Sequence, residues 1–317
     1  MTESALPHDP LWPRAGSWPT PGRARAHVGI LGVPTHLTSL SPTGAHTTPA
    51  AVRGALNRYS TWSYAVDRDL TGLRAVDLGD VRQPDGPAGE VRTQEAVGSW
   101  TGDLLIAIGG DNSLTYPVAV GMGATGVVTL DAHHDLRDGS SNGSPIRRLL
   151  DAGLPGRRVV QVGLADFANS AAYVERARAA GITIITRDEV AESGIRAAMH
   201  RALTIAGVGP NPRIHVDLDV DVCDRSVAPA CPASVPGGLS AYELRLAARA
   251  AGADPRVVSL DIAEVDATAD SPDERTVRLA ALCVLEAAAG VAVRSTASPD
   301  LPQLPANHTE REPGSLG

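Results

Sequence analysis

Three side chains that commonly bind metal ions follow one another at alternate positions near the middle of the chain. Asp131, His133 and Asp135 come directly after residues 127–130, an apolar, β-branched run that is typical of a buried parallel strand. Side chains two positions apart share a face in an extended chain, so we expect the three groups to converge at the strand end or across a bend there. Two carboxylates and an imidazole suit a Mn(II)-like or Zn(II)-like ion.

A second acidic cluster lies much later in the chain, in an apolar strand expected over residues 214–221. Asp217, Asp219 and Asp221 share one face of that strand, where buried charge is costly unless a cation neutralises it. Two such strands indicate one shared site, and carboxylates that bridge two ions can hold a hydroxide for hydrolysis. The alternative is that each cluster is a solvated strand end.

Both clusters belong to a regular alternation of strands and helices. Strand and helix segments alternate roughly eight times, and each expected strand ends in glycine or an acidic residue. This order predicts a doubly wound parallel sheet that binds ligands at the carboxyl ends of its strands. The strands are expected over residues 26–32, 73–78, 104–108, 127–130, 159–163, 182–185, 214–221 and 257–265, with a helix over 188–206.

The composition is that of a globular α/β protein. The 317 residues include 43% apolar residues, which is enough for a full core, and the net charge of −8 comes without a basic stripe for nucleic acid. No window approaches about 18 consecutive apolar residues, and no leader-like segment opens the chain, so a cytoplasmic protein without a membrane span is expected. Three cysteines without C-x-x-C spacing argue against a disulfide framework or a thiolate zinc site.

The two ends of the chain differ in composition from its centre. Residues 1–24 contain five prolines with Trp12 and Trp18 and have no periodicity, so we expect an extended arm that docks through its tryptophans. Residues 25–293 are expected to form a single domain. Residues 294–317 are expected to be a polar, flexible tail.

Four segments resemble the signatures of the ureohydrolases, the family that includes arginase, agmatinase and formimidoylglutamase. They are Gly109-Gly-Asp-Asn-Ser113, Asp131-Ala-His-His-Asp135, Asp217-Leu-Asp219 and Glu264. Their order, spacing and strand context all agree, and the resemblance covers about residues 28–290. It implies a three-layer α/β/α fold with a mainly parallel eight-stranded central sheet, two manganese ions, and homo-oligomers such as trimers or hexamers.

The resemblance also implies a role for individual residues. Asp131 and Asp217 would bridge the two ions, and Glu264 would hold the amidine or guanidine group of the substrate as a charge-assisted partner. Asp135 would orient the attacking hydroxide, which makes Asp135 and Glu264 the expected catalytic residues. The full implied set of metal ligands is Asn112, Asp131, His133, Asp135, Asp217 and Asp219.

Two asparagines depart from the pattern of the family. The family usually has histidine as an ion ligand where this chain has Asn112, and a neutral amide oxygen is a weaker ligand than imidazole. We therefore expect the ion beside Asn112 to bind weakly or to be absent from some preparations. Asn142 stands where arginases and agmatinases tend to have a histidine thought to shuttle protons, which argues against their two substrates.

Within the family, residues 135–147, 166–170 and 228–239 look most like formimidoylglutamases, whose substrate carries two carboxylates. Such a substrate needs cationic or amide partners, and Arg137, Asn142 and Arg147 are the candidates. For Arg147 the alternative is a surface arginine that is bonded only to water.

The resemblance therefore implies manganese-dependent hydrolysis of a linear amidine C–N bond, in which N-formimidoyl-L-glutamate and water give L-glutamate and formamide during histidine degradation. One alternative is an agmatinase, a guanidinobutyrase or another guanidino-acid hydrolase, which would release urea. A second is a metal-poor family member without turnover. The expected partner is a small amidine or guanidine, with neither nucleic acid nor membrane, because neither a basic stripe nor a long apolar window is present. A nucleotide-binding sheet protein is a third alternative, but no G-x-G-x-x-G or P-loop lysine supports it.

Overall fold

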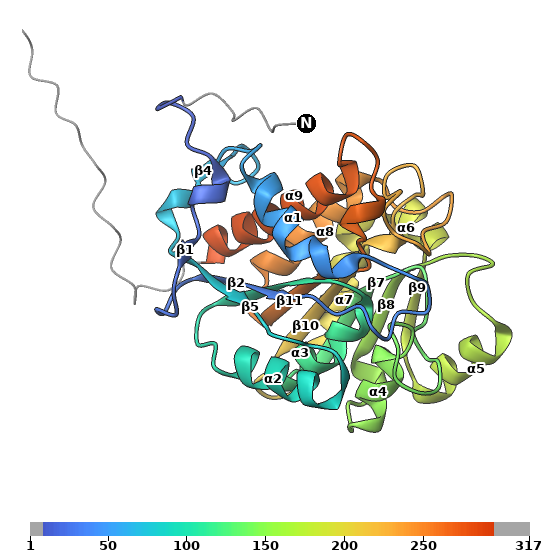
Figure 1. The fold of residues 1–317 in the computed structure, drawn as a ribbon. Coiled ribbons are helices and arrows are strands. Elements are labelled where there is room, and N and C mark those ends of the chain that lie inside the picture. The colour runs from blue at the N-terminus through green and yellow to red at the C-terminus, as the bar shows by residue number, and fades with distance from the viewer. Residues whose placement is uncertain (1–8, 295–317) are drawn as a thin grey trace, which may run out of the picture.

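The structure is a computed structural model that describes residues 9–294, and a nine-stranded sheet lies at its centre (Figure 1). All neighbouring strands of this sheet are parallel, so their carboxyl ends lie along one edge. Their spatial order is β1-β5-β2-β6-β11-β10-β7-β8-β9. The strands are β1 Thr20–Pro21, β2 Val28–Val33, β5 Ala75–Asp80, β6 Leu104–Gly109, β7 Gly126–Leu130, β8 Val159–Leu164, β9 Thr183–Thr186, β10 Ile214–Asp219 and β11 Val257–Ala263, with a separate two-stranded pair, β3 Trp62–Ser63 and β4 Arg68–Asp69.

Helices cover both faces of the sheet, which confirms the expected three-layer architecture. In Figure 1, α1, α8 and α9 lie above the sheet, and α2, α3 and α4 lie below it. The helices are α1 Thr48–Leu56, α2 Gly86–Gly98, α3 Thr115–Gly121, α4 Pro145–Asp151, α5 Ala171–Ala180, α6 Arg187–Ser193, α7 Ile195–Ala206, α8 Ala241–Ala253 and α9 Arg275–Arg294.

The two faces of the sheet carry different cores. Towards α1, α7, α8 and α9 the buried apolar side chains form one continuous cluster. On the opposite face they form two clusters, one around β2 and β6 and the other around β7 and β8. The central strands β10 and β11 lie between these two clusters, and on this face they carry buried polar side chains: His215, Asp217, Ser259 and Asp261.

The sheet contains all eight strands that the sequence predicts, and it has a ninth. The additional strand, β1, belongs to the proline-rich N-terminal segment and pairs with Val76 and Asp77 of β5. Beside it, Trp18 is buried and its indole nitrogen donates a hydrogen bond to the carbonyl oxygen of Leu73 at 3.1 Å, whereas Trp12 is exposed. A strand of two residues, one of them a proline, has no alternation pattern, so β1 could not be predicted from the sequence. Residues 1–8 and 295–317, where the arm starts and where nearly all of the expected tail falls, lie outside the described residues.

The single helix expected over residues 188–206 is wrong, because the structure divides it into α6 and α7. Gly194 separates the two helices with φ 80° and ψ 148°, a backbone conformation that favours glycine. Thr186 begins α6 with a capping box to Glu189, and Ser240 begins α8 with the capping box to Glu243 that the sequence indicates.

The strands at the centre of the sheet end earlier than the sequence pattern indicates. β10 ends at Asp219, whose side chain accepts a hydrogen bond from the backbone N–H of Asp221 at 2.9 Å and starts a short 3₁₀ turn. The expectation that Asp221 continues one strand face is therefore wrong. β11 ends at Ala263, and the next residue, Glu264, has a positive φ of 62°.

One helix in the described part of the chain, α9, is long and apolar enough to cross a membrane. Its most apolar window is 83% buried inside the protein, where α9 packs against α8 and α1. Burial of this kind is typical of the core helix of a compact domain.

Candidate metal centre

The side chains of interest gather at the carboxyl ends of the four central strands, β6, β11, β10 and β7. Because these strands are parallel neighbours, the residues that follow each of them meet at one place. Asn112 follows β6, and Glu264 follows β11. Asp219 ends β10 and Asp221 follows it, and residues 131–135 follow β7. Segments that are far apart in the sequence thus form a single site.

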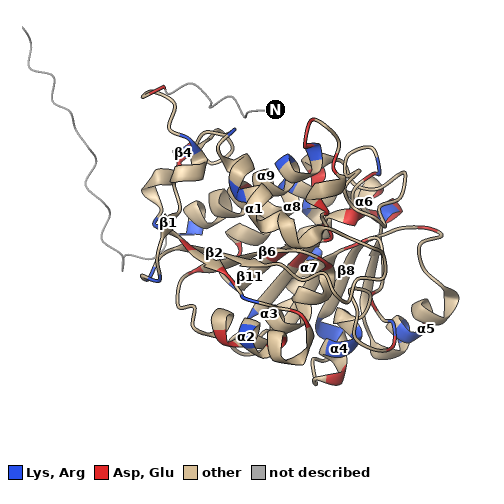
Figure 2. Cartoon of the chain, viewed as in Figure 1, with Lys and Arg blue, Asp and Glu red and all other residues tan. Residues whose placement is uncertain are grey.

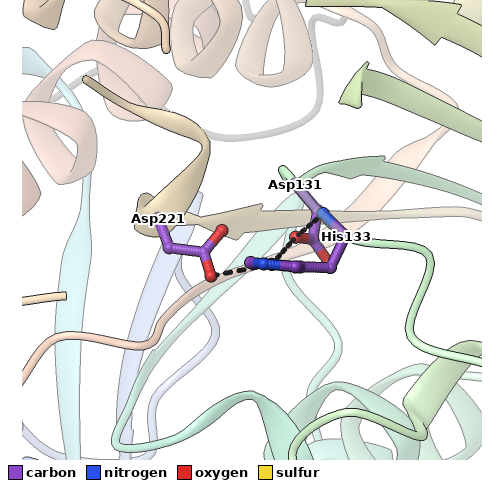
Figure 3. Close-up of side chains that lie close together, drawn as sticks. All are labelled: Asp131, His133 and Asp221. Atoms are coloured by element: carbon purple, nitrogen blue, oxygen red, sulfur yellow. Dashed lines mark hydrogen bonds and ion pairs between the residues drawn. The ribbon is translucent and has the colours of Figure 1, made fainter. Parts of the chain in front are cut away.

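Asp131, His133 and Asp221 form a first group whose potential ligand atoms all lie within 4.8 Å of one another. His133 Nδ1 is 3.1 Å from an oxygen of Asp221 and 3.3 Å from an oxygen of Asp131, and Figure 3 shows the imidazole ring lying between the two carboxylates. The backbone N–H of His133 also donates to Asp131 at 2.7 Å. This arrangement directs two carboxylates and one imidazole at a common point.

Asp131, Asp135 and Asp219 form a second group that meets the same 4.8 Å limit. Asp131 belongs to both groups, so one carboxylate lies between two neighbouring clusters of ligand atoms. A shared carboxylate of this kind is what a site for two ions requires. Asp135 has a φ of 53°, a left-handed conformation of the sort that is found at functional sites.

The buried carboxylates of this site carry more negative charge than the protein neutralises. Burial, together with the charge of Asp221, raises the pKa of Asp131 to about 6. Burial and neighbouring acids also raise the pKa values of Asp135 and Asp219 well above the ordinary range. Burial alone would lower the pKa of His133, but the carboxylates of Asp221 and Asp131 raise it to about 12.

These charges and one unpaired atom show that the residues fit a metal ion. Asp131 Oδ2 is buried and has no hydrogen-bond partner among the described residues. A buried carboxylate oxygen without a partner is costly unless a cation contacts it. Four carboxylates and one imidazole form a hard donor set that suits Mn(II), and divalent ions there would replace the protons that the acids otherwise hold.

Asp217 lies outside both groups, although the resemblance implied that it bridges two ions. It is inside the sheet layer, where its Cα is in register with Thr129 on β7 and with Asp261 on β11. Both of its carboxylate oxygens are buried and unpaired among the described residues, and burial and the charge of Asp261 raise its pKa well above the usual range. Asp217 comes two residues before Asp219 on the same face of β10, so it lies within the sheet and not at the carboxyl edge where the two groups lie.

Asp221 is the residue of the site that the sequence reasoning left aside. The ligand set implied by the resemblance includes Asp217 and Asp219 but not Asp221, whereas the structure places Asp221 against His133. The sequence contains a signal for this position of Asp221. At β7 the candidate ligands, residues 131–135, all come after the apolar run has ended. By the same rule, Asp219 and Asp221, at the end of the second run, were better candidates than Asp217.

Asn112 turns its amide nitrogen, not its oxygen, towards the site. Its Nδ2 donates to Asp135 Oδ2 at 2.8 Å, while its Oδ1 accepts a hydrogen bond from the hydroxyl of Thr115 at 2.6 Å. An amide held in this way offers no oxygen to a cation. The expected metal ligand is therefore, in this geometry, a hydrogen-bond donor to Asp135.

Glu264 faces the two groups from the end of β11. Its Oε1 accepts hydrogen bonds from the backbone N–H of Asn112 at 2.8 Å and from Asn142 Nδ2 at 2.7 Å, and its own backbone N–H donates to the carbonyl of Gly110. Burial raises the pKa of Glu264 to about 8, although these hydrogen bonds lower it. A cationic group beside Glu264 would favour the charged carboxylate.

The two arginines expected to bind substrate differ in how they are engaged. Arg147 donates hydrogen bonds to the backbone carbonyls of Arg137 and Gly139 and pairs with Asp151, so it holds the loop that follows the metal-binding segment. Arg137 is exposed, and its guanidinium has no ion pair with a described residue. Of the two, only Arg137 is free to bind a ligand.

Comparison with known proteins identifies the family to which this site belongs. The model of the Arginase family matches residues 26–290, which is most of the chain and includes every element of the site. The chain belongs to the arginase family.

Several arginase-family proteins match this chain over most of their length. A formimidoylglutamase from Halalkalibacterium halodurans is 34% identical over 293 residues, which cover 88% of this chain and 91% of that protein. The crystal structure of formimidoylglutamase from Bacillus subtilis matches with a TM-score of 0.83 and 30% identity, covering 92% and 95% of the two chains. A histidine-for-asparagine variant of Trypanosoma cruzi formiminoglutamase, crystallised with Mn²⁺, has a TM-score of 0.81 and 26% identity, covering 89% and 99%.

In this member of the arginase family, two side-chain amides hold the metal-binding loop, residues 131–135. Gln161 Nε2 donates to the carbonyl oxygen of His134 at 2.9 Å, and Gln161 Oε1 lies 2.7 Å from the ring nitrogen Nδ1 of the same residue. Asn169 accepts from the backbone N–H of His134 and donates to the carbonyl of Ala132, each at 2.9 Å. These bonds fix the backbone from which His133 and Asp135 project.

We expect Gln161→Ala to weaken Mn²⁺ binding by about 10- to 100-fold, because groups that orient metal ligands commonly contribute that much to affinity. Gln161→Glu, which keeps an acceptor for the ring of His134 but loses the donor, should have a smaller effect. Calorimetric titration of the metal-free protein with Mn²⁺ measures the dissociation constants, with Gln94→Ala on α2 as the control. A Gln161→Ala protein that is less stable but binds Mn²⁺ within twofold of the wild type would contradict this role.

Proposed function

We propose that this protein is a manganese-dependent hydrolase that converts N-formimidoyl-L-glutamate and water into L-glutamate and formamide. The observation that carries the proposal is the position of Glu264, a buried carboxylate that faces two groups of metal-type ligands and has one oxygen without a hydrogen bond from a described residue. The similar proteins named formimidoylglutamase, which match nearly the whole chain, support the same substrate.

Five residues would hold the manganese ions: Asp131, His133, Asp135, Asp219 and Asp221. When bound, the ions would act as Lewis acids, making water nucleophilic near neutral pH and stabilising the oxygen that the water adds to the amidine carbon. The chain itself would hold these ligand atoms in place and away from bulk water, because all but one of the five side chains are buried.

Glu264 would bind the cationic amidine and present its carbon to the attacking water. Asp135 Oδ2 accepts a hydrogen bond from Asn112, so its Oδ1 is available to orient that water. The oxygen of water forms a bond to the formimidoyl carbon, and the bond from this carbon to the glutamate nitrogen breaks. The glutamate nitrogen takes up both protons of that water and leaves as the ammonium group of glutamate. The carbon, its new oxygen and the terminal NH₂ group leave as formamide.

Arg137 would bind a carboxylate of the glutamate portion. The chain has no lysine, so every fixed cation in it is an arginine. Arg137 follows the metal-binding loop by two residues, is exposed, and has no ion pair with a described residue. Arg147, in contrast, pairs with Asp151 on α4, whose arginines are blue in Figure 2. A guanidinium binds a carboxylate through two parallel hydrogen bonds, which gives direction as well as charge.

The manganese-loaded protein is expected to release formamide from N-formimidoyl-L-glutamate and to release little urea from agmatine, guanidinobutyrate or arginine. In Arg137→Ala the KM for the diacid should rise by about 10- to 100-fold, while turnover of a neutral formamidine changes little. Arg157→Ala, an exposed arginine before the amino end of β8, is the matched control. Urea release that exceeds formamide release would contradict the proposed substrate, and equal effects of Arg137→Ala on both amidines would contradict its role.

We also propose that the protein works in the cytoplasm as a homo-oligomer, a trimer or a hexamer. The match to the arginase family supports this proposal, because the resemblance to that family implies homo-oligomers. The mass of the assembly in solution, measured by light scattering, tests this proposal.

A further inference from the structure

The amide of Asn142 is fixed at both ends in the site. Its Oδ1 accepts a hydrogen bond from the backbone N–H of Leu40 at 2.9 Å, and its Nδ2 donates to Glu264 Oε1 at 2.7 Å. Turning the amide over would place an oxygen against a carboxylate and an N–H against an N–H. Asn142 therefore presents a donor, and only a donor, to Glu264.

The two oxygens of Glu264 are not equivalent as a result. Oε1 accepts two hydrogen bonds, one from Asn142 and one from the backbone N–H of Asn112 at 2.8 Å. Oε2 accepts none from a described residue. The carboxylate thus has one oxygen that the protein has filled and one that a ligand can use.

This asymmetry matters because formimidoyl and guanidino groups differ in how many donors they offer. A guanidinium carbon carries two terminal NH₂ groups, and a carboxylate with two free oxygens binds both of them at once. A formimidoyl carbon carries one terminal NH₂ group and a hydrogen atom in place of the second. At Glu264, Asn142 Nδ2 already occupies the position on Oε1 that the second NH₂ group would need.

We propose that Asn142 determines specificity by supplying to Glu264 Oε1 the hydrogen bond that a guanidine's second amino group would otherwise make. The inference rests on the proposed function, in which Glu264 binds the amidine. A formimidoyl substrate has no second terminal amino group, so it does not compete with Asn142 for Oε1. A guanidino substrate either leaves an N–H unpaired in a buried site or displaces Asn142 and its bond to Leu40, and both are costly.

The test uses two substrates that differ only at the reacting carbon, N-formimidoyl-L-glutamate and N-amidino-L-glutamate. Both keep the two carboxylates, so Arg137 contributes equally to each. With the manganese-loaded protein, kcat/KM is measured through formamide release from the first and urea release from the second. We expect the wild type to favour the formimidoyl compound by at least about 100-fold.

In Asn142→Ala, which removes the donor, we expect this preference to fall by at least about tenfold, the range for one buried hydrogen bond. Asn142→Asp keeps an acceptor for Leu40 while removing the donor, so it should lower the preference too and serves as the second variant. Ser141→Ala, in the same loop, should leave the ratio within about twofold.

A purely structural role for Asn142 would lower both rates together and leave their ratio unchanged. That result, with the wild type still releasing formamide, would overturn the specificity role and leave the proposed function standing. A wild type that prefers the guanidino compound and releases urea would overturn the proposed function together with this inference.

Discussion

Asp221→Asn is expected to lower kcat/KM by about a thousandfold, about 4 kcal/mol of transition-state stabilisation. The carboxylate of Asp221 lies 3.1 Å from His133 Nδ1 and belongs with Asp131 to one of the two ligand groups. Replacing it with a neutral amide removes one negative charge from a site whose function requires cations. The measurement is the rate of formamide release at saturating Mn²⁺, together with the manganese content of the protein after dialysis.

Asp217→Asn is the informative companion to this variant. Asp217 has the same side chain and is fully buried in β10, but it belongs to neither ligand group. We expect Asp217→Asn to retain its manganese through dialysis, and Asp221→Asn to lose most of one ion. The opposite outcome, in which Asp217→Asn loses metal and Asp221→Asn retains it, would restore Asp217 as the bridging ligand and contradict the arrangement described above.

The fold could be predicted from the sequence because local patterns and tertiary structure agree in this chain. The apolar runs before Asp131 and Asp219 are buried parallel strands, as β-branched residues bounded by glycine or acids indicate. The prediction of a single helix over residues 188–206 was wrong because of one residue. Gly194 divides it into two helices, although its flanking residues would favour one continuous helix.

The site was predictable in location but not in its detailed assignment. The alternation rule places Asp217, Asp219 and Asp221 on one face, but it holds only while the strand continues, and β10 ends at Asp219. The two groups of potential ligand atoms lie beyond the strand end, so they contain Asp219 and Asp221, the later members of the series. The length of the strand depends on its neighbours in the sheet, which are distant in sequence.

The two asparagines show a second limit of reasoning from sequence alone. An amide has a donor end and an acceptor end, and only its partners decide which end faces the site. For Asn112 the deciding partner is the carboxylate of Asp135, because the hydroxyl of Thr115 could either donate or accept. For Asn142 the deciding partner is the backbone N–H of Leu40. Leu40 is about a hundred residues from Asn142, so local spacing carries no information about this contact.

The stability of the metal-free protein should fall as the pH rises from 5 to 8, and Mn²⁺ should restore it most at pH 8. In the folded protein the pKa values of Asp131 and Glu264, about 6 and about 8, lie above their unfolded values, so folding retains protons that the unfolded chain has released. The stability from these protons is complete below the unfolded values and is lost as the pH rises through 6 and then 8. The pKa of His133 is also raised, to about 12, so His133 too makes the folded protein less stable as the pH rises above the pKa of an unfolded histidine.

The measurement is the melting temperature of chelator-treated protein at pH 5, 6.5 and 8, with and without Mn²⁺. We expect the metal-free melting temperature to fall by at least about 5 °C across this range, because each retained proton is worth about 1.4 kcal/mol per pH unit. Glu264→Gln, which cannot lose a proton, should show a shallower fall between pH 6.5 and 8.

Deprotonated ligands bind cations more tightly, so the stabilisation by Mn²⁺ grows with pH. A metal-free protein that becomes more stable from pH 5 to 8 would show that its buried carboxylates are already charged and that the site holds this charge without cations.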